Sequence, residues 1–184
     1  MKEQILIAGF GGQGVLAMGK MLAEAALAEG REVSWLPSYG PEMRGGTSNV
    51  SVNLSDQPIG SPVIGAGDAS CVVAMNLPSL LKFENFVRPN GVILVNSSII
   101  DRKVQRRGVH AAYVPANDIA SELGNPKVLN MVMLGAYIAR TGLVKAETMI
   151  DYVKKVFGGK KPELVELNKK AIERGAAAVL MTNL

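Results

Sequence analysis

The pattern of apolar and polar positions predicts strands and helices in alternation along the chain. Residues 5–8 form a short apolar strand that leads into a glycine-rich turn, and helix-forming residues then extend to about Ala28. Residues 31–36 read as a second strand. Residues 49–54 alternate strictly between polar and apolar side chains, a period of two that is typical of a half-buried strand. Residues 71–75 form a continuous apolar run, which predicts a central strand of a parallel sheet.

A helix is expected directly after this run. Asn76 is placed to cap its first turn, and Pro78 suits that turn because its backbone nitrogen needs no hydrogen-bond partner there. Asn90-Gly91 is expected to end the helix. Its apolar face is predicted to consist of Leu80, Leu81, Phe83 and Phe86.

The second half of the chain continues the alternation. It predicts strands over 92–96 and 109–114, followed by helices over 118–123, 128–141, 146–157 and 162–180, with Gly158-Gly159 between the last two. The helix over 128–141 is apolar almost all round, which implies burial on most sides.

This succession of elements predicts an α/β fold. We expect a Rossmann-like three-layer domain with a mostly parallel sheet, helices on both faces and at least one strand inserted out of the regular pattern. No repeat, low-complexity segment or linker interrupts the pattern, so residues 1–184 are expected to form a single domain.

Several polar or glycine-rich segments directly follow predicted strands. They are two glycine-rich segments, Asn76, and Asn96 with Ser97-Ser98. Ligands and partners of such sheets bind beyond the carboxyl ends of the strands. These segments are therefore expected to gather along one edge of the sheet.

The first glycine-rich segment, residues 9–14, fits the spacing G-x-G-x-x-G between a strand and a helix. Glycines there permit a tight turn and the close approach of a ligand, and the N–H groups at the start of the helix suit an anion. The same glycines can serve only the packing of strand against helix. The candidate site residues in this segment are Gly9, Gly11, Gly12, Gln13 and Gly14.

The neighbouring residues complete neither a dinucleotide site nor an ATP-hydrolysing site. A dinucleotide site needs an acidic residue at the end of the second strand, but Glu32 stands at the start of that strand. A Walker loop needs Lys and Ser or Thr where this chain has Val15 and Leu16. The sequence therefore disfavours NAD(P) or FAD binding and argues against ATP hydrolysis.

The second glycine-rich segment joins the second and third predicted strands. Glu42 and Arg44 are embedded there among glycines and a proline. One interpretation is a rigid loop that presents Arg44 to an anion or a carboxylate, and the other is an internal ion pair that fixes the loop. The candidate ligand-binding or interface residues are Tyr39, Gly40, Pro41, Glu42, Arg44, Gly45, Gly46 and Thr47, together with Asn76.

Composition narrows the possible functions. The chain has 184 residues, 48% of them hydrophobic, which is enough for one substantial core. No apolar run approaches the roughly 18 residues needed to span a bilayer, and no signal sequence precedes the first strand, so a soluble cytoplasmic protein with no membrane contact is expected. The net charge of +4 comes from basic pairs scattered among acidic residues. No nucleic-acid partner is expected, because aromatic residues do not interleave with these pairs.

No catalytic constellation is evident. The chain contains one cysteine, Cys71, within an apolar strand, and one histidine, His110, among apolar neighbours at the start of another strand. Both are expected to be structural. One thiol and one imidazole cannot build an iron–sulfur cluster or a structural zinc site, and no G-x-S-x-G elbow is present. We therefore predict no catalytic residue and no metal ligand in this chain.

Taken together, these segments resemble the gamma subunit of 2-oxoacid:ferredoxin oxidoreductases. The resemblance extends along the chain and rests on residues 9–15, 38–49, 60–62, 74–76, 91–98, 129–136 and 166–171. The loop with paired glycines after Arg44 is most similar to the branch that acts on 2-oxoglutarate or branched-chain 2-oxoacids, and 2-oxoglutarate is the expected substrate.

The resemblance implies a subunit of an enzyme that converts a 2-oxoacid and coenzyme A to acyl-CoA, carbon dioxide and reduced ferredoxin. Thiamine diphosphate with Mg²⁺ and [4Fe-4S] clusters are then expected in the alpha, beta and small ferredoxin-like delta subunits, with ferredoxin as the acceptor. This chain would bind no cofactor alone. Its two glycine-rich loops would face the partner subunits and the coenzyme A channel, where Arg44 and residues 11–14 are candidates to contact phosphates.

Two other functions remain open. One is a free-standing nucleotide-dependent oxidoreductase, which only the first glycine-rich segment favours. The other is a purely structural assembly subunit, for which the apolar helices over 128–141 and 146–157 would serve as docking surfaces.

Overall fold

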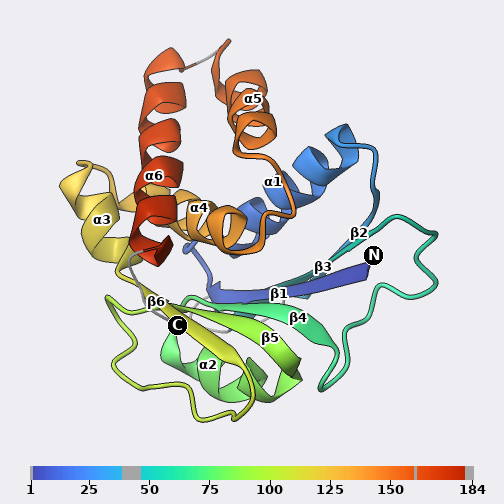
Figure 1. The fold of residues 1–184 in the computed structure, drawn as a ribbon. Helices are drawn as coiled ribbons and strands as arrows, with labels where there is room; N and C mark the ends of the chain where they lie inside the picture. Colours follow the sequence, from blue (N-terminus) through green and yellow to red (C-terminus); the bar gives the residue numbers. More distant parts are fainter. Residues whose placement is uncertain (1, 39–46, 160, 181–184) are drawn as a thin grey trace.

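A computed structural model describes residues 2–38, 47–159 and 161–180. Its centre is a six-stranded sheet with the strand order β2-β3-β1-β4-β5-β6 (Figure 1). Strand β3 is antiparallel to both of its neighbours, and β1, β4, β5 and β6 are parallel to one another. The expectation of a mostly parallel sheet with one inserted strand is confirmed. The strands are β1 (Lys2–Phe10), β2 (Glu32–Ser38), β3 (Thr47–Ser55), β4 (Ala69–Ala74), β5 (Val87–Asn96) and β6 (His110–Val114).

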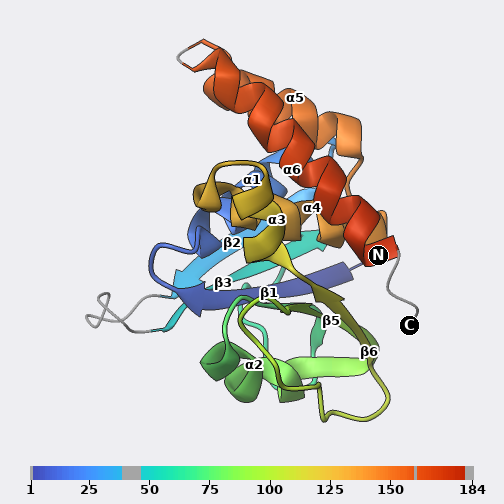
Figure 2. The ribbon, with the colours of Figure 1, turned by 90° about the vertical axis from the view of Figure 1, so that its left-hand side faces the viewer.

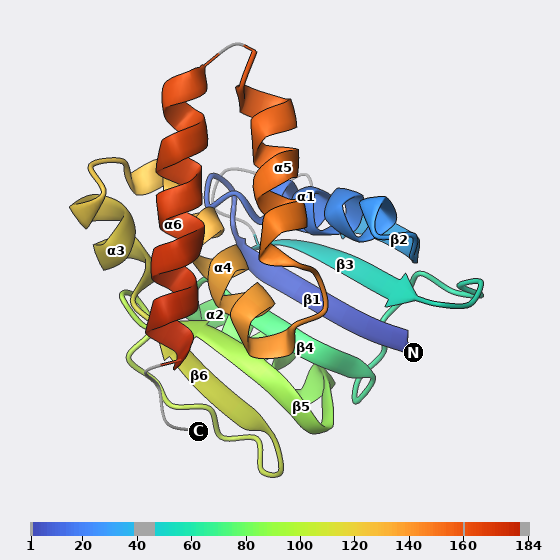
Figure 3. The ribbon, with the colours of Figure 1, turned by 45° about the horizontal axis from the view of Figure 1, so that its top comes forward.

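Helices cover both faces of the sheet, but unequally. Helices α1, α3, α4, α5 and α6 lie on one face, and α2 with loops lies on the other (Figures 1 and 2). Helix α5 and the first half of α6 project beyond the sheet as a hairpin (Figure 3). The helices are α1 (Val15–Ala28), α2 (Leu77–Phe83), the 3-10 turn η1 (Glu84–Phe86), α3 (Ala116–Glu122), the 3-10 turn η2 (Pro126–Val128), α4 (Leu129–Thr141), α5 (Ala146–Phe157) and α6 (Pro162–Leu180).

Two hydrophobic clusters, one on each face, hold these layers together. In β1, Ile5 and Ile7 belong to the larger cluster, and Leu6 and Ala8 belong to the smaller one. The alternation follows from the pleat, because successive side chains of a strand point to opposite faces. Strand β4 is buried along its whole length between β1 and β5, which confirms the prediction of a central parallel strand.

The prediction that β3 is half-buried is wrong. Its polar positions Ser51, Asn53 and Ser55 are all buried, at most 9% exposed. The Asn53 Nδ2 donates to Ser34 Oγ and to the carbonyl oxygen of Pro62, both at 2.9 Å. The turn-rich segment after β3 thus folds back over the face that was expected to meet solvent, and the amide of Asn53 supplies hydrogen bonds that replace water.

The helix after β4 is shorter than its apolar pattern suggests. Leu80 and Phe83 are buried, whereas Leu81 is 49% exposed and does not belong to the apolar face. The helix ends at Phe83, and Phe86 follows in a 3-10 turn. Asn90-Gly91 does not end the helix, because β5 already begins at Val87 and Asn90 lies within it.

Helix α4 is buried from Leu129 to Ile138, as its uniform apolarity predicted. Its long contact with α6 depends on glycines, because a β-carbon at Gly135 would lie 2.0 Å from the carbonyl oxygen of Ile172. The proposal that α4 forms a docking surface is therefore wrong, since this chain's own α6 and sheet already cover the helix. Helix α5 buries only Met149 and Val153.

Candidate functional site

The carboxyl ends of the parallel strands bring the candidate segments to one edge of the sheet. The glycine-rich loop follows β1, Asn76 follows β4, and Asn96 ends β5. Strand β2 also ends at this edge and β3 begins there, because Ser38 pairs near the start of β3 and Thr47 pairs with Phe10. The expected convergence is confirmed for the segments that the structure describes.

Gln13 folds back inside the glycine-rich loop. Its Oε1 accepts the backbone N–H of Phe10 at 2.7 Å, and its Nε2 donates to the carbonyl oxygen of Met75 at 3.1 Å. Gly9 leaves room for this arrangement, because a β-carbon there would lie 2.6 Å from Gln13 Oε1 and 2.7 Å from Met75 Cβ. The side chain of Gln13 thus bonds to the protein, while Gly11 and Gly12 are exposed.

Asn76 connects two elements with one side chain. Its Oδ1 accepts the backbone N–H of Ser79 at 2.9 Å, which caps α2 as predicted. Its Nδ2 faces Gln13 Oε1 at 3.4 Å. Asn76 is buried, so both polar atoms of its amide are used within the protein.

The loop passes into α1 through Gly14, which adopts a left-handed conformation with a φ of 74°. Asn130, at the start of α4, occupies the space beside it, because a β-carbon at Gly14 would lie 2.6 Å from Asn130 Nδ2. Asn130 Nδ2 also faces the carbonyl oxygen of Gly14 at 3.5 Å. Glycine is therefore needed at position 14 for two reasons: its backbone angle is positive, and a side chain would collide with Asn130.

A second pair of amides extends this edge towards β6. Asn96 Nδ2 donates to Asn117 Oδ1 at 2.7 Å and faces the carbonyl oxygen of Met75 at 3.4 Å. Asn96 is fully buried, and its Oδ1 has no hydrogen-bond partner among the described residues. Nearby, Ser98 Oγ donates to Asp118 Oδ2 at 3.0 Å on the exposed rim. Sequence reasoning placed Asn96 at this edge but missed Asn117 and Asn130, because nothing in their local pattern marks a tertiary contact.

The second glycine-rich segment lies outside the described residues. This applies to the candidates Tyr39, Gly40, Pro41, Glu42, Arg44, Gly45 and Gly46, and only the backbone of Thr47 is described, as the first residue of β3. The two interpretations of Glu42 and Arg44 both remain predictions. The described positions on either side of the segment, Ser38 and Thr47, lie at the edge that carries the glycine-rich loop.

The cysteine and the histidine lie away from this edge. Cys71 is buried within β4, and burial raises the pKa of its thiol, so it is not a reactive nucleophile. His110 is exposed at the first residue of β6, at the opposite end of the strand from Asn117. Among the described residues, no group of three or more His, Cys, Asp or Glu side chains could hold a metal ion.

The geometry of β2 argues against a dinucleotide site. Glu32 stands at the amino end of β2, far from the glycine-rich loop, as the sequence indicated. In addition, β3 separates β2 from β1, so the end of β2 lies two strand spacings, roughly 10 Å, from β1. In dinucleotide-binding folds, the acidic residue that binds the ribose follows a strand adjacent to the first one. A residue after β2 of this chain lies too far from the glycine-rich loop for that role.

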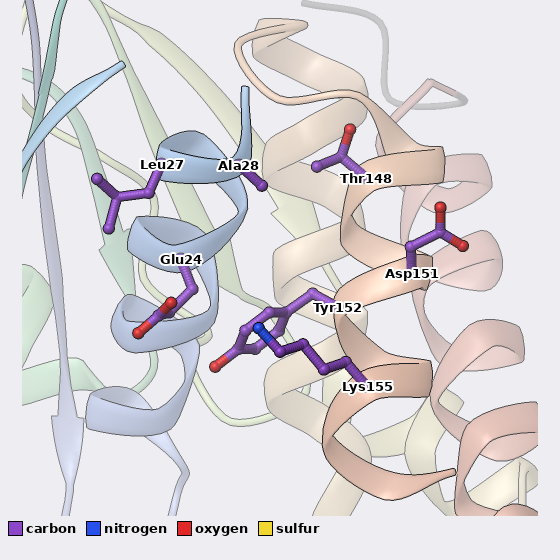
Figure 4. A pocket seen from close by; sticks show the side chains of 7 residues that line it. All are labelled: Glu24, Leu27, Ala28, Thr148, Asp151, Tyr152 and Lys155. Carbon is purple, nitrogen blue, oxygen red and sulfur yellow. The ribbon is translucent and has the colours of Figure 1, made fainter. Parts of the chain in front are cut away.

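A groove of about 510 Å³ lies elsewhere, between α1 and α5. Figure 4 shows the side chains of Tyr152 and Lys155 directed from α5 towards α1, where Glu24 lies. Partial burial and the Glu24 carboxylate raise the pKa of Tyr152. The groove lies about 15 Å along α1 from the glycine-rich loop. No sequence motif marks it, and its residues take no part in the hydrogen bonds at the strand ends.

No helix within the described part of the chain is both long enough and apolar enough to cross a membrane.

Comparison with known proteins gives a consistent family assignment. Residues 4–178 match the sequence profile of the family described as pyruvate ferredoxin/flavodoxin oxidoreductase. The chain is 43% identical over 175 residues to ketoisovalerate oxidoreductase subunit VorA of Methanothermobacter marburgensis, covering 94% of this chain and 36% of that one. It is 34% identical over 187 residues to 2-oxoglutarate synthase subunit KorC of the same organism, covering 98% of each chain. This chain thus spans about a third of the VorA subunit and nearly all of KorC.

Solved structures agree with this assignment. The gamma subunit of keto/oxoacid ferredoxin oxidoreductase from Geobacter sulfurreducens superposes with a TM-score of 0.81 at 31% identity, covering 98% of this chain and 99% of that one. The 2-oxoglutarate:ferredoxin oxidoreductase of Magnetococcus marinus gives a TM-score of 0.88 over 99% of this chain and 32% of that one. At 22% identity, the second comparison shows the fold alone. On the strength of the profile match and of relatives aligned along nearly its whole length, the chain belongs to the pyruvate ferredoxin/flavodoxin oxidoreductase family.

Proposed function

We propose that this chain is the gamma subunit of a 2-oxoacid:ferredoxin oxidoreductase. The enzyme would cleave the carboxylate of a 2-oxoacid as carbon dioxide, join the remaining acyl group to the thiol of coenzyme A, and pass the two released electrons to ferredoxin. The observation that carries the proposal is the match to the family over residues 4–178, together with the similarity to a solved gamma subunit over 98% of this chain.

The chemistry of the described residues supports a subunit that binds and positions the substrate coenzyme A and does not itself carry out the bond-breaking step. Thiamine diphosphate would supply the carbon–carbon bond cleavage, and we place it, with Mg²⁺, in the alpha and beta subunits. Cys71 is buried within the sheet and cannot hold a [4Fe-4S] cluster, which needs several thiolates. We therefore propose that the clusters lie in partner chains, among them a ferredoxin-like delta subunit, and that electrons pass from these to ferredoxin.

The contribution of this chain lies at the carboxyl edge of the sheet. Gly11 and Gly12 are exposed there, next to the first turn of α1, whose backbone N–H groups have no partner within the helix and no side-chain cap. We propose that these groups bind phosphate oxygens of coenzyme A and that Arg44, from the neighbouring segment, adds a positive charge. The side chain of Gln13 is excluded from this contact, because its amide is already bonded inside the loop.

The relatives suggest two substrate classes. Identity is 43% to a ketoisovalerate subunit and 34% to a 2-oxoglutarate subunit. The higher identity favours a branched-chain 2-oxoacid as the first substrate to assay, and 2-oxoglutarate, which the loop after Arg44 suggested, is the second. Assay of the assembled enzyme with ketoisovalerate, 2-oxoglutarate and pyruvate distinguishes them by kcat/KM.

The test begins with anaerobic affinity purification of the chain from its native host, followed by mass spectrometry. We expect stoichiometric recovery of thiamine-binding and cluster-binding chains, and reduction of ferredoxin by the complex only when a 2-oxoacid and coenzyme A are both present. Recovery as a lone oligomer that binds NAD(P) or flavin would overturn the proposal in favour of a free-standing oxidoreductase.

A purely structural assembly subunit is the second candidate, since the exposed faces of α5 could contact other chains. Arg44→Ala in the assembled complex separates the two functions. A coenzyme A contact predicts a raised KM for coenzyme A with normal assembly. An assembly role alone predicts that the KM and the turnover both stay unchanged.

A further inference from the structure

We propose that a row of carboxamide side chains positions the glycine-rich loop for its ligand without touching that ligand, and that Asn76 is the central positioning residue. The amide row is defined as Asn130, Gln13, Asn76, Asn96 and Asn117. This inference rests on the proposed function, because it concerns how the loop is held for coenzyme A.

The backbone fixes the orientation of the first two amides. Gln13 must present Oε1 to the N–H of Phe10 and Nε2 to the carbonyl of Met75, because reversing the amide would place donor against donor and acceptor against acceptor. Asn76 must present Oδ1 to the N–H of Ser79. Its Nδ2 is therefore left to face Gln13 Oε1.

The carbonyl oxygen of Met75 joins the two halves of the row. It accepts from Gln13 Nε2 at 3.1 Å and faces Asn96 Nδ2 at 3.4 Å, and the Met75 N–H donates to Ala8 O at 2.8 Å. Met75 is fully buried, so these bonds are shielded from water. The turn after β4 is thus held by β1 on one side and by the amides on the other.

The outer members bring in two further elements. At one end of the row, Asn96 donates a hydrogen bond to Asn117 in the first turn of α3. At the other end, Asn130 at the start of α4 lies against Gly14. Asn96 Oδ1 is buried without a partner among the described residues, although such groups normally find one. A buried polar arrangement with an unpaired oxygen is more costly than apolar packing and is expected where position matters.

The row therefore fixes the loop from inside. Each amide bonds to protein atoms, whereas Gly11 and Gly12 are exposed and no side chain caps the first turn of α1. Displacing the loop would weaken phosphate binding without changing the thiamine chemistry in the partner subunits. The expected signature is a raised KM for coenzyme A with an unchanged KM for the 2-oxoacid and a nearly unchanged kcat at saturating coenzyme A.

Asn76→Asp tests the row in the assembled enzyme. Aspartate keeps an oxygen that caps α2, but it replaces the donor that faces Gln13 Oε1 with a second acceptor. We expect the KM for coenzyme A to rise about tenfold, as for loss of one buried hydrogen bond with an acceptor left unpaired. Hydrogen exchange of peptides covering residues 9–14 should become faster in the complex, with no loss of assembly.

Asn125→Asp is the control for the same substitution at another helix cap. Asn125 Oδ1 accepts the N–H of Lys127 at 3.0 Å and caps η2, again with a proline in the first turn, but it makes no bond to the amide row. This variant should leave the KM for coenzyme A and the exchange of residues 9–14 unchanged.

A third variant separates failure of this inference from failure of the proposed function. Gly11→Asp puts a negative charge on the exposed side of the loop, where the phosphates are proposed to bind. If Gly11→Asp raises the KM for coenzyme A and Asn76→Asp does not, the amide row has no positioning role and the proposed function stands. If neither variant nor Arg44→Ala changes that KM, the amide row and the proposed coenzyme A contact are both overturned, and the chain serves the complex in assembly alone.

Discussion

Gly175 on α6 faces the carbonyl oxygen of Val132 on α4 so closely that a β-carbon at position 175 would lie 1.8 Å from that oxygen. Gly135 on α4 makes the reciprocal approach to Ile172 on α6. The two helices therefore cross in backbone contact. This crossing allows α6 to cover α4 while its first half projects beyond the sheet with α5 (Figure 3).

Gly175→Ala should destabilise the protein by about 2–4 kcal/mol, because the helices must separate to admit one methyl group. Urea unfolding followed by circular dichroism measures the change in the midpoint. Gly60→Ala is the control, since a β-carbon at Gly60 would meet nothing within 4 Å. Its effect should lie within about 0.5 kcal/mol. Equal midpoints for the two variants would contradict the close crossing.

Gly14 and Asn130 should be energetically coupled. Gly14→Ala incurs a backbone cost of about 1–2 kcal/mol for a positive φ, and a further cost from the contact with Asn130. In an Asn130→Ala background the two shortest contacts, with Nδ2 and Cγ, are removed and only the β-carbon of residue 130 remains, at 3.0 Å, so the cost of Gly14→Ala should fall. A double-mutant cycle on the free energy of unfolding measures the difference, which we expect to exceed about 0.5 kcal/mol. Strict additivity of the two changes would show that the contact contributes nothing.

Glu84 should contribute more to the free energy of unfolding than a surface ion pair does, because it also binds the backbone of the loop between β5 and β6. Its carboxylate is buried, accepts the backbone N–H of Gln105 at 3.1 Å and pairs with Arg102 at 3.4 Å. Glu84→Gln should cost about 1.5–3 kcal/mol, as for a hydrogen bond to a charged group. Glu3→Gln, which breaks the more exposed pair with Arg88, should cost less than about 1 kcal/mol. Thermal unfolding of the two variants gives the comparison, and a larger loss for Glu3→Gln would contradict it.

Alkaline pH should destabilise the fold through Cys71. Burial raises the pKa of this thiol above its unfolded value, so the folded state keeps a proton that the unfolded state releases. The stabilisation is complete below the unfolded pKa, near 8.5, and falls as the pH rises above it, by up to about 1.4 kcal/mol per pH unit. Urea unfolding between roughly pH 7 and 10.5 should show this decline.

Cys71→Ala should give a shallower decline over the same range, because one titrating group has been removed. The variant should also be less stable at neutral pH, since it leaves a small cavity in β4. A slope identical to that of the unaltered protein would assign the pH dependence to other groups.

The sequence predicted those features that follow from local periodicity. The boundaries of α5 and α6 agree with their helical patterns, and the described segments after β1, β4 and β5 gathered at one edge because each followed a predicted parallel strand. The capping role of Asn76 was likewise local, since its partner Ser79 lies three residues away.

Features that depend on distant partners were not predictable in this way. The alternation in β3 indicated one exposed face, but a later segment covers it and Asn53 bonds to Pro62 there. Asn130 meets Gly14 across a separation of 116 residues, and only the packing of α4 against the loop creates that contact. The same holds for Asn96 and Asn117, whose roles appear when β5 and β6 are placed side by side.

A row built only from carboxamides has no ionisable member, so its hydrogen-bond pattern stays the same at every pH at which the protein is folded. An edge formed instead by carboxylates or imidazoles would rearrange as those groups lost or gained protons. The loop on this edge is thus held in one geometry whatever the proton concentration. In the enzyme proposed above, any acid–base dependence of catalysis must then originate in the ligands, in the partner chains or in charged residues outside the amide row.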